Sequence, residues 1–167
     1  MCSVSHGCNC GRYGDLKSSC ICTPNQIQRY RSKISGPLLD RIDIHIEVPR
    51  IEYKDLTSER ICETSAQIRE RVNKARAIQR ERFSAIGVFC NASMSHKQIR
   101  KYCVLGKEEK ALLKMAMTEL NLSARAYDRI LKVSRTIADV EGSDDIKTDH
   151  ISEAIQYRSL DRDIFFG

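Results

Sequence analysis

The stretch Ile34-Ser-Gly-Pro-Leu-Leu-Asp-Arg-Ile-Asp-Ile-His-Ile-Glu-Val-Pro49 decides how the fold of this chain is interpreted. Ser35-Gly36-Pro37 is a turn signal, because proline fixes its own φ and restricts the residue before it. From Ile42 to Val48 apolar and polar residues alternate, which predicts a strand with one buried face. Arg41 stands between an apolar anchor and this strand. We therefore expect its guanidinium to be held in place, where it is suited to clamp a phosphate or a carboxylate.

Four cysteines form two close pairs upstream of this stretch. Cys8 and Cys10 make the first pair, and Cys20 and Cys22 make the second. If the loop between the pairs folds back, four thiolates come together, and four sulfur ligands suit tetrahedral Zn²⁺. This spacing is tighter than the more common Cys-x-x-Cys, so a reduced loop without metal and a pair of disulfides stay open as alternatives.

The totals describe a moderately basic chain with enough apolar residues for a core. It has 167 residues, a net charge of +6 and 41% hydrophobic residues, which fits one domain or one domain with a small satellite. No signal peptide or membrane-spanning run is visible, so we expect the cytosol. We find neither a Gly-x-x-x-x-Gly-Lys-Ser/Thr phosphate loop nor a strand that ends in paired acids. We therefore expect that the chain alone does not form a P-loop nucleotide site.

Capping signals and helical periodicity predict helices over most of the remaining sequence. The predicted helices run from Thr23 to before Ser35, from Thr57 or Ser58 to about Ala85, from Ser95 to Cys103, from Lys107 to Leu120, from Ser123 to before Gly142, and onward from Thr148 or Asp149. We expect the helix over 107–120 to be buried on much of its surface. The long helix has one apolar stripe, formed by Ile61, Ile68, Val72, Ala75 and Ile78.

Three blocks of this sequence together resemble the magnesium-chelatase-like AAA+ ATPases. One is the stretch quoted above. The second is Cys-x-Cys-Gly-x-Tyr-Gly-Asp followed by Cys-x-Cys-Thr-Pro, from Cys8 to Pro24. The third is Leu122-Ser-Ala-Arg-Ala-Tyr-Asp-Arg-Ile-Leu-Lys-Val-Ser-Arg-Thr-Ile-Ala-Asp139. The blocks occur in the family's order and cover nearly the whole chain. Within the family, the ComM/YifB-type competence-associated branch is the most similar.

The resemblance implies a fold class and a domain plan. The chain is expected to be mainly α, with the C-terminal end of an AAA+ α/β core, one helix and one strand, followed by a helical-bundle lid domain. The expected parts are a Cys-rich loop that is a possible zinc knuckle (1–22), the end of the core with the arginine-finger segment (23–50), the lid (57–160) and a tail (161–167).

The resemblance also implies roles for two arginines. Arg41 matches the arginine finger, a catalytic residue that completes the ATP site of a neighbouring subunit. Arg125 matches the second sensor, which contacts the nucleotide from the lid. Arg125 lies two residues after the cap Ser123, where free backbone N–H groups already favour anions. The alternative for Arg125 is an ordinary pair with a nearby acid such as Asp128.

The function implied by the resemblance belongs to a longer protein. The chain is expected to be the C-terminal part of a hexameric motor that uses ATP and Mg²⁺ to remodel DNA, similar to ComM-type branch-migration helicases of natural transformation. The chain alone is expected to be inactive. Two alternatives stay open: a non-enzymatic helical binding module with a zinc knuckle that docks on nucleic acid or protein, and a magnesium-chelatase subunit.

Overall fold

The computed structural model describes residues 5–15, 18–39, 41–48, 51, 53 and 63–158. Within these ranges the chain forms seven α-helices and one 3₁₀ helix, and it forms no strand. The elements are α1 (Pro24–Arg31), α2 (Gly36–Leu39), α4 (Ser65–Phe83), η1 (Asn91–Ser93), α5 (His96–Tyr102), α6 (Lys107–Glu119), α7 (Ala124–Glu141) and α8 (Thr148–Gln156). The mainly α class predicted from the sequence is confirmed.

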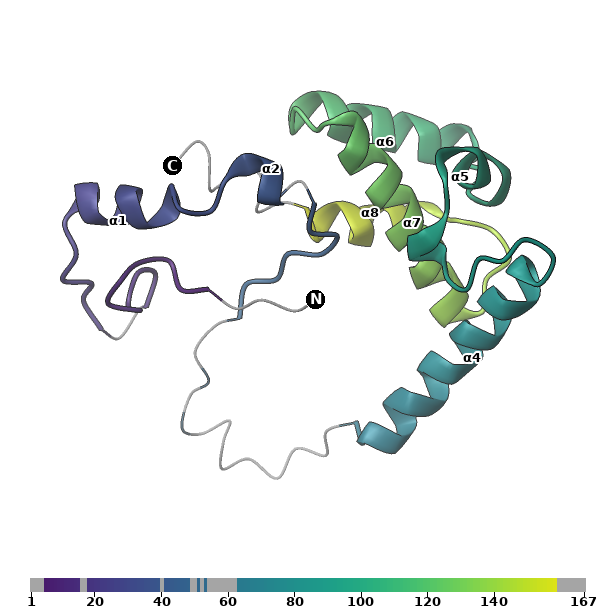
Figure 1. Ribbon diagram of the computed structural model, residues 1–167, viewed down its shortest axis with the longest axis horizontal. Coiled ribbons are helices and arrows are strands. Elements are labelled where there is room, and N and C mark those ends of the chain that lie inside the picture. The colour runs from purple at the N-terminus through teal and green to yellow at the C-terminus, as the bar shows by residue number, and fades with distance from the viewer. Residues whose placement is uncertain are drawn as a thin grey trace.

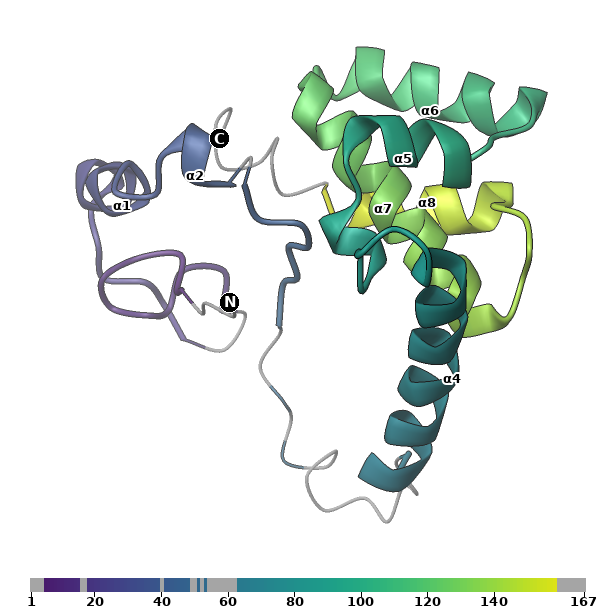
Figure 2. The ribbon, with the colours of Figure 1, turned by 45° about the vertical axis from the view of Figure 1, so that its right-hand side comes forward.

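The helices α4 to α8 form a bundle, and the cysteine loop with α1 and α2 lies to one side of it (Figure 1). The segment that follows α2 runs from this smaller part toward α7 and α8, as both ribbon views show (Figure 2). None of the helices described is long and apolar enough to cross a membrane.

Helix α7 is the centre of the bundle. It packs against α8, α4, α5 and η1, while α6 packs against α8. Its buried face follows a four-residue repeat, because Ile130, Ser134 and Ala138 are all 0% exposed. Around it the core is completed by Phe83, Ile99, Leu113, Ile151 and Ala154. Each large apolar side chain buried in this way contributes about 1.5–3 kcal/mol.

Local sequence signals set the helix ends. Thr23 and Ser95 each cap a helix. The side-chain oxygen of each accepts the N–H of a glutamine three residues later, and its own N–H donates to that glutamine's side chain, as predicted for α1 and α5. Ser123 Oγ accepts the Ala126 N–H at the start of α7. Helix α7 ends at Gly142, whose φ of 78° is left-handed and favours glycine.

The strand predicted from Ile42 to Val48 is not formed. Residues 41–48 have neither helical nor strand geometry, and Ile44, Ile46 and Val48 are 44%, 67% and 82% exposed. A strand needs a neighbouring strand to pair its backbone groups, and no other strand exists among the residues described. The alternating pattern alone therefore does not produce a strand here.

Three details of the helical bundle also differ from the predictions. Helix α4 begins at Ser65, because Thr64 and Gln67 form a capping box there; the predicted caps Thr57 and Ser58 lie outside the described residues. The predicted apolar stripe of α4 is not buried in its first half, where Ile68 is 42% exposed. In both views this end of α4 projects away from the bundle (Figure 2). In α6, predicted to be largely buried, only Leu113 is fully covered.

Candidate metal centre and exposed arginines

The four cysteines predicted to bind zinc lie together. Their sulfur atoms all lie within 4.8 Å of one another; the four residues are Cys8, Cys10, Cys20 and Cys22. The Cys8 sulfur is 3.3 Å from that of Cys10 and 3.6 Å from that of Cys20. In a tetrahedron with Zn–S bonds of about 2.3 Å, the sulfurs would be about 3.8 Å apart. The donor set and its spacing therefore fit a closed, four-sulfur structural zinc site.

Glycines shape the loop that carries the first two cysteines. Gly11 and Gly14 have φ values of 73° and 85°, which side chains rarely adopt, and the Gly11 N–H closes a turn on the Cys8 carbonyl. A Cβ on Gly7 would lie only 3.0 Å from the Tyr13 ring. The turns hold Cys8 and Cys10 on the same side of the loop as the second pair.

The thiols influence one another's ionisation. A hydrogen bond from the Arg12 backbone, followed by one from Cys8, lowers the pKa of Cys10 to about 6. A backbone hydrogen bond at Cys22 tends to lower the pKa of Cys20, but burial and the neighbouring thiols outweigh it and raise that pKa to about 12. Four thiolates this close repel one another, so a divalent cation is what would let all four ionise.

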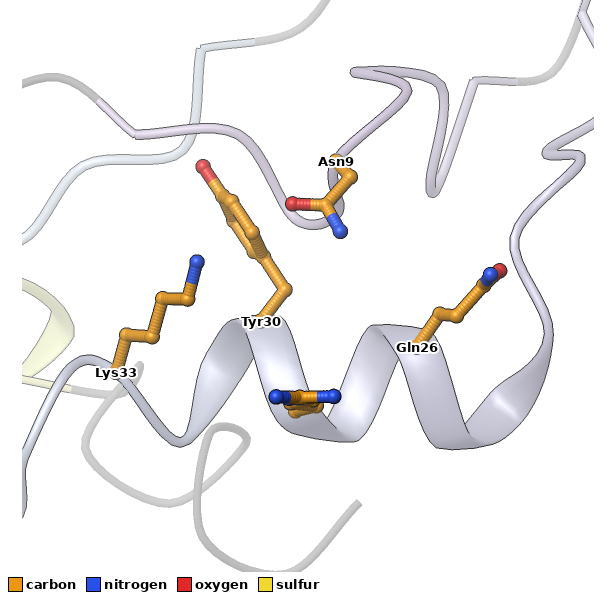
Figure 3. A pocket seen from close by; sticks show the side chains of 5 residues that line it. Asn9, Gln26, Tyr30 and Lys33 are labelled. Atoms are coloured by element: carbon orange, nitrogen blue, oxygen red, sulfur yellow. The ribbon is translucent and has the colours of Figure 1, made fainter.

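The cysteine loop is joined to α1 by aromatic and cationic side chains. The Arg31 guanidinium carbon lies 4.6 Å from the centre of the Tyr13 ring. An open pocket of about 370 Å³ lies between the loop and the helix. Figure 3 shows Asn9 from the loop between Tyr30 and Gln26 of α1, with Lys33 on the far side of Tyr30. The lining consists of Asn9, Gln26, Arg29, Tyr30 and Lys33.

Arg41, the predicted arginine finger, is exposed and lies in a hydrogen-bonded turn that follows α2. Its N–H donates to the Leu38 carbonyl at 3.0 Å, and the Ile42 N–H donates to the Leu39 carbonyl at 2.9 Å. Leu39 is 6% exposed and anchors the turn, whereas Leu38 is 49% exposed and does not. Asp40 lies outside the described residues. The backbone around Arg41 is thus fixed while its side chain faces solvent.

The residues after Arg41 are attached to the helical bundle. Asp43 forms an ion pair with Arg129 of α7. Arg158, just after α8, donates to the carbonyl of Ile42. The sequence patterns did not point to these contacts, because they join residues about ninety to more than a hundred positions apart.

Arg125, the predicted second sensor, is exposed in the first turn of α7. Arg129 and Lys132 follow at the four- and seven-residue spacing of one helix face. Partial burial, followed by the charge of Arg129, lowers the pKa of Lys132. Three cations thus share one face of α7, although Arg129 is paired with Asp43. The face begins at a helix N-terminus, which suits an anion. Asp128 is the acid named above as an alternative partner for Arg125. Both of its carboxylate oxygens lie 3.1 Å from His96 Nδ1.

A buried polar cluster was missed by the sequence interpretation. Asp139 accepts hydrogen bonds from Arg82, Asn91 and Arg135. Burial by itself would raise the pKa of Asp139, but the bonds from Arg82 and Asn91 outweigh it and hold the pKa below its usual range. No sequence pattern pointed to Arg82, because helical periodicity does not show which cation meets a buried acid. This cluster holds α4, η1 and α7 together.

Comparison with known proteins gives consistent matches. Residues 62–158 match the family described as magnesium chelatase, subunit ChlI C-terminal, and residues 2–56 match magnesium chelatase, subunit ChlI. The competence protein ComM of Haemophilus influenzae is 47% identical over 142 residues, which is 84% of this chain. The uncharacterized proteins YifB of Salmonella typhimurium and Escherichia coli are each 40% identical over 143 residues. The chain spans 27% of the length of these curated relatives.

Proposed function

Because this chain belongs to the magnesium chelatase subunit ChlI family, as a ComM/YifB-type member, we propose that it is the C-terminal part of an AAA+ ATPase that remodels DNA. The family matches and the order of the three sequence blocks support this proposal. The proposed whole protein is a hexameric ring in the cytoplasm that uses ATP and Mg²⁺. The relative named as a competence protein favours a role in natural transformation, through branch migration of DNA.

Arg125 is proposed to bind the nucleotide phosphates from the lid of its own subunit. A guanidinium in the first turn of α7 adds a full positive charge to the partial charge of the free backbone N–H groups. The exposure of Arg125 in the first turn of α7 is the observation that carries this proposal.

Arg41 is proposed to act in the ATP site of the neighbouring subunit. Its exposed side chain stands on a turn fixed by Leu39, which suits a group that must project from its own subunit. During phosphoryl transfer it would stabilise the charge that develops on the γ-phosphoryl oxygens. Arginine fingers generally contribute about 10³–10⁵ in rate.

The four cysteines are proposed to bind one structural Zn²⁺. Their sulfurs already have nearly tetrahedral spacing, and a four-cysteine set leaves no open position for catalysis. A bound ion would cross-link residues 8–22, which offer little apolar surface of their own, and would hold them against α1 through the Tyr13–Arg31 contact.

The experiment that tests this function starts from the complete reading frame. The encoded protein should carry a phosphate loop upstream, and it should hydrolyse ATP with Mg²⁺, faster when four-way DNA junctions are present. An Arg125→Ala variant should lose most of this turnover, and an Arg100→Ala variant, altered at an exposed cation of α5, should keep it. A complete protein without a phosphate loop, or without Mg²⁺-dependent turnover, would refute the proposal.

A second candidate function is supported by the pocket between the cysteine loop and α1. Arg29, Lys33 and Tyr30 supply two cations and an aromatic ring, which is the combination that binds single-stranded nucleic acid. Under this alternative the chain is a binding module and no enzyme. Fluorescence anisotropy should show that a labelled single-stranded oligonucleotide binds the chain. Its affinity should fall when salt is added, and it should be lower for the Arg29→Ala variant. Unchanged binding by this variant would reject the pocket as the site.

A further inference from the structure

Three contacts attach the segment that follows Arg41 to the end of the bundle. Arg129 pairs with Asp43, Arg158 donates to the carbonyl of Ile42, and the N–H of His45 donates to the carbonyl of Tyr157 at 2.9 Å. Together these contacts are called the latch. They join residues 42–45 to α7 and to the residues directly after α8.

The latch is built from side chains of different burial. Arg158 is 1% exposed, so its charge-assisted bond to the Ile42 carbonyl is shielded from water. The side chains of Arg129 and Asp43 are 24% and 51% exposed. The ion pair is therefore accessible to substitution without opening the core, whereas Arg158 belongs to the packing of the bundle end.

We propose that Asp43 and Arg129 are positioning residues that fix Arg41 relative to Arg125, so that the finger and the sensor of one subunit move together. This inference rests on the proposed function, in which Arg41 serves the neighbour's ATP site and Arg125 serves its own. The latch would then pass a change at one nucleotide site to the next site around the ring.

The covalent distances make this coupling tight. Arg41 is two residues from Asp43, which allows a separation of at most about 7 Å between their Cα atoms. Arg125 and Arg129 are one turn apart on α7, about 6 Å along a rigid helix. A shift of α7 that follows the loss of a phosphate at Arg125 would carry Arg129, and with it Asp43 and the Arg41 turn. Two sites that bias one connected element in this way are thermodynamically coupled.

The first test uses this chain and does not depend on ATP hydrolysis. Amide exchange at His45 reports the latch, because its N–H is bonded to the Tyr157 carbonyl. In Asp43→Asn and in Arg129→Met, exchange at His45 should rise about two- to fivefold, as expected for loss of a partly exposed ion pair. The charge-swapped double variant, Asp43→Arg with Arg129→Asp, should restore protection. Lys110→Met, at an exposed site on α6, is the control and should change nothing.

The second test uses the complete protein. Asp43→Asn should lower kcat for ATP and leave KM for ATP unchanged, because the nucleotide still binds while the finger is misplaced. The charge-swapped variant should regain kcat, which a merely structural defect would not predict. If the complete wild-type protein does not hydrolyse ATP, the proposed function is overturned. The amide-exchange experiment then still tests whether the latch forms. Unchanged exchange at His45 in both single variants, or altered exchange with unchanged kcat, would overturn this inference.

Discussion

Arg82 of α4 and Asp139 of α7 form a two-point ion pair across the bundle. Arg82 Nη2 lies 2.5 Å from Asp139 Oδ1, and Arg82 Nη1 lies 2.8 Å from Oδ2. Arg135 adds a third donor to the same carboxylate, and its other guanidinium nitrogens bond the carbonyls of Ser143 and Asp144 just beyond α7. The carboxylate is thus the point at which α4, α7 and the turn after α7 are joined.

We expect Asp139→Ala to be among the most destabilising substitutions in this chain. The Asp139 side chain is fully buried, so its removal leaves the guanidinium groups of Arg82 and Arg135 without their common acceptor. Breaking a buried ion pair by removing one partner costs about 3–5 kcal/mol. Urea unfolding followed by circular dichroism should show this loss. Glu119→Gln, at an exposed site on α6, should stay within about 0.5 kcal/mol of the wild type.

The same carboxylate predicts a loss of stability in acid. The folded state lowers the pKa of Asp139 below its ordinary value of 3.8, so the unfolded state takes up the proton first as the pH falls. The stabilisation is therefore complete above that ordinary value and is lost as the pH falls through the folded pKa. The free energy of unfolding, measured from pH 7 to pH 2, should fall steeply below about pH 4. In Asp139→Asn this fall in the free energy of unfolding should be smaller. An equal fall in both proteins would mean that other groups cause it.

The helices could be predicted from the sequence because their signals are local. The pair Thr23 and Gln26, like Gly142, acts within one turn of its own helix, and the structure uses these residues as predicted. Local signals could not decide whether residues 42–48 form a strand, because a strand depends on pairing with a partner strand elsewhere in the sequence. The four cysteines were recognised by spacing, and the structure brings them together. The latch and the Asp139 cluster depend on which distant helix face meets which side chain, and no local signal carries that information.

We predict one Zn²⁺ per chain, bound by the four cysteines. Elemental analysis of the purified chain should give one zinc, and Cys20→Ser should abolish stoichiometric binding. Cys90→Ser removes a cysteine outside the cluster and should keep the metal. Affinity should fall in acid, because four thiols must lose their protons to bind the ion. Metal-free wild-type protein with four freely titratable thiols in the loop would contradict the assignment.

The complete protein should tolerate Arg125→Ala in folding but not in catalysis. The side chain is exposed at the start of α7, so its loss should leave the melting temperature nearly unchanged. If it binds a phosphate, turnover should fall about 10- to 100-fold, as for a lost hydrogen bond between charged groups. If the variant has a lower melting temperature but normal ATP turnover, Arg125 only stabilises the helical bundle.

The proposed ring of subunits makes a sharper prediction for Arg41. In the complete protein, Arg41→Ala should abolish turnover and spare ATP binding, because a finger acts on the neighbour's nucleotide and only in the transition state. Arg41→Lys should not rescue it fully, since a lysine lacks the planar guanidinium that bonds two phosphate oxygens at once. Nucleotide binding is measured with a fluorescent ATP analogue and turnover by phosphate release.

Mixing subunits then tests whether Arg41 acts across an interface. A ring that combines Arg41→Ala subunits with subunits altered in the phosphate loop contains some interfaces at which an intact loop meets an intact finger. Such mixtures should recover part of the activity, although each variant alone is inactive. If rings that demonstrably exchange subunits show no recovery, Arg41 acts within its own subunit or only supports the turn after α2. The exposed position of Arg41, on a turn anchored by Leu39, favours recovery.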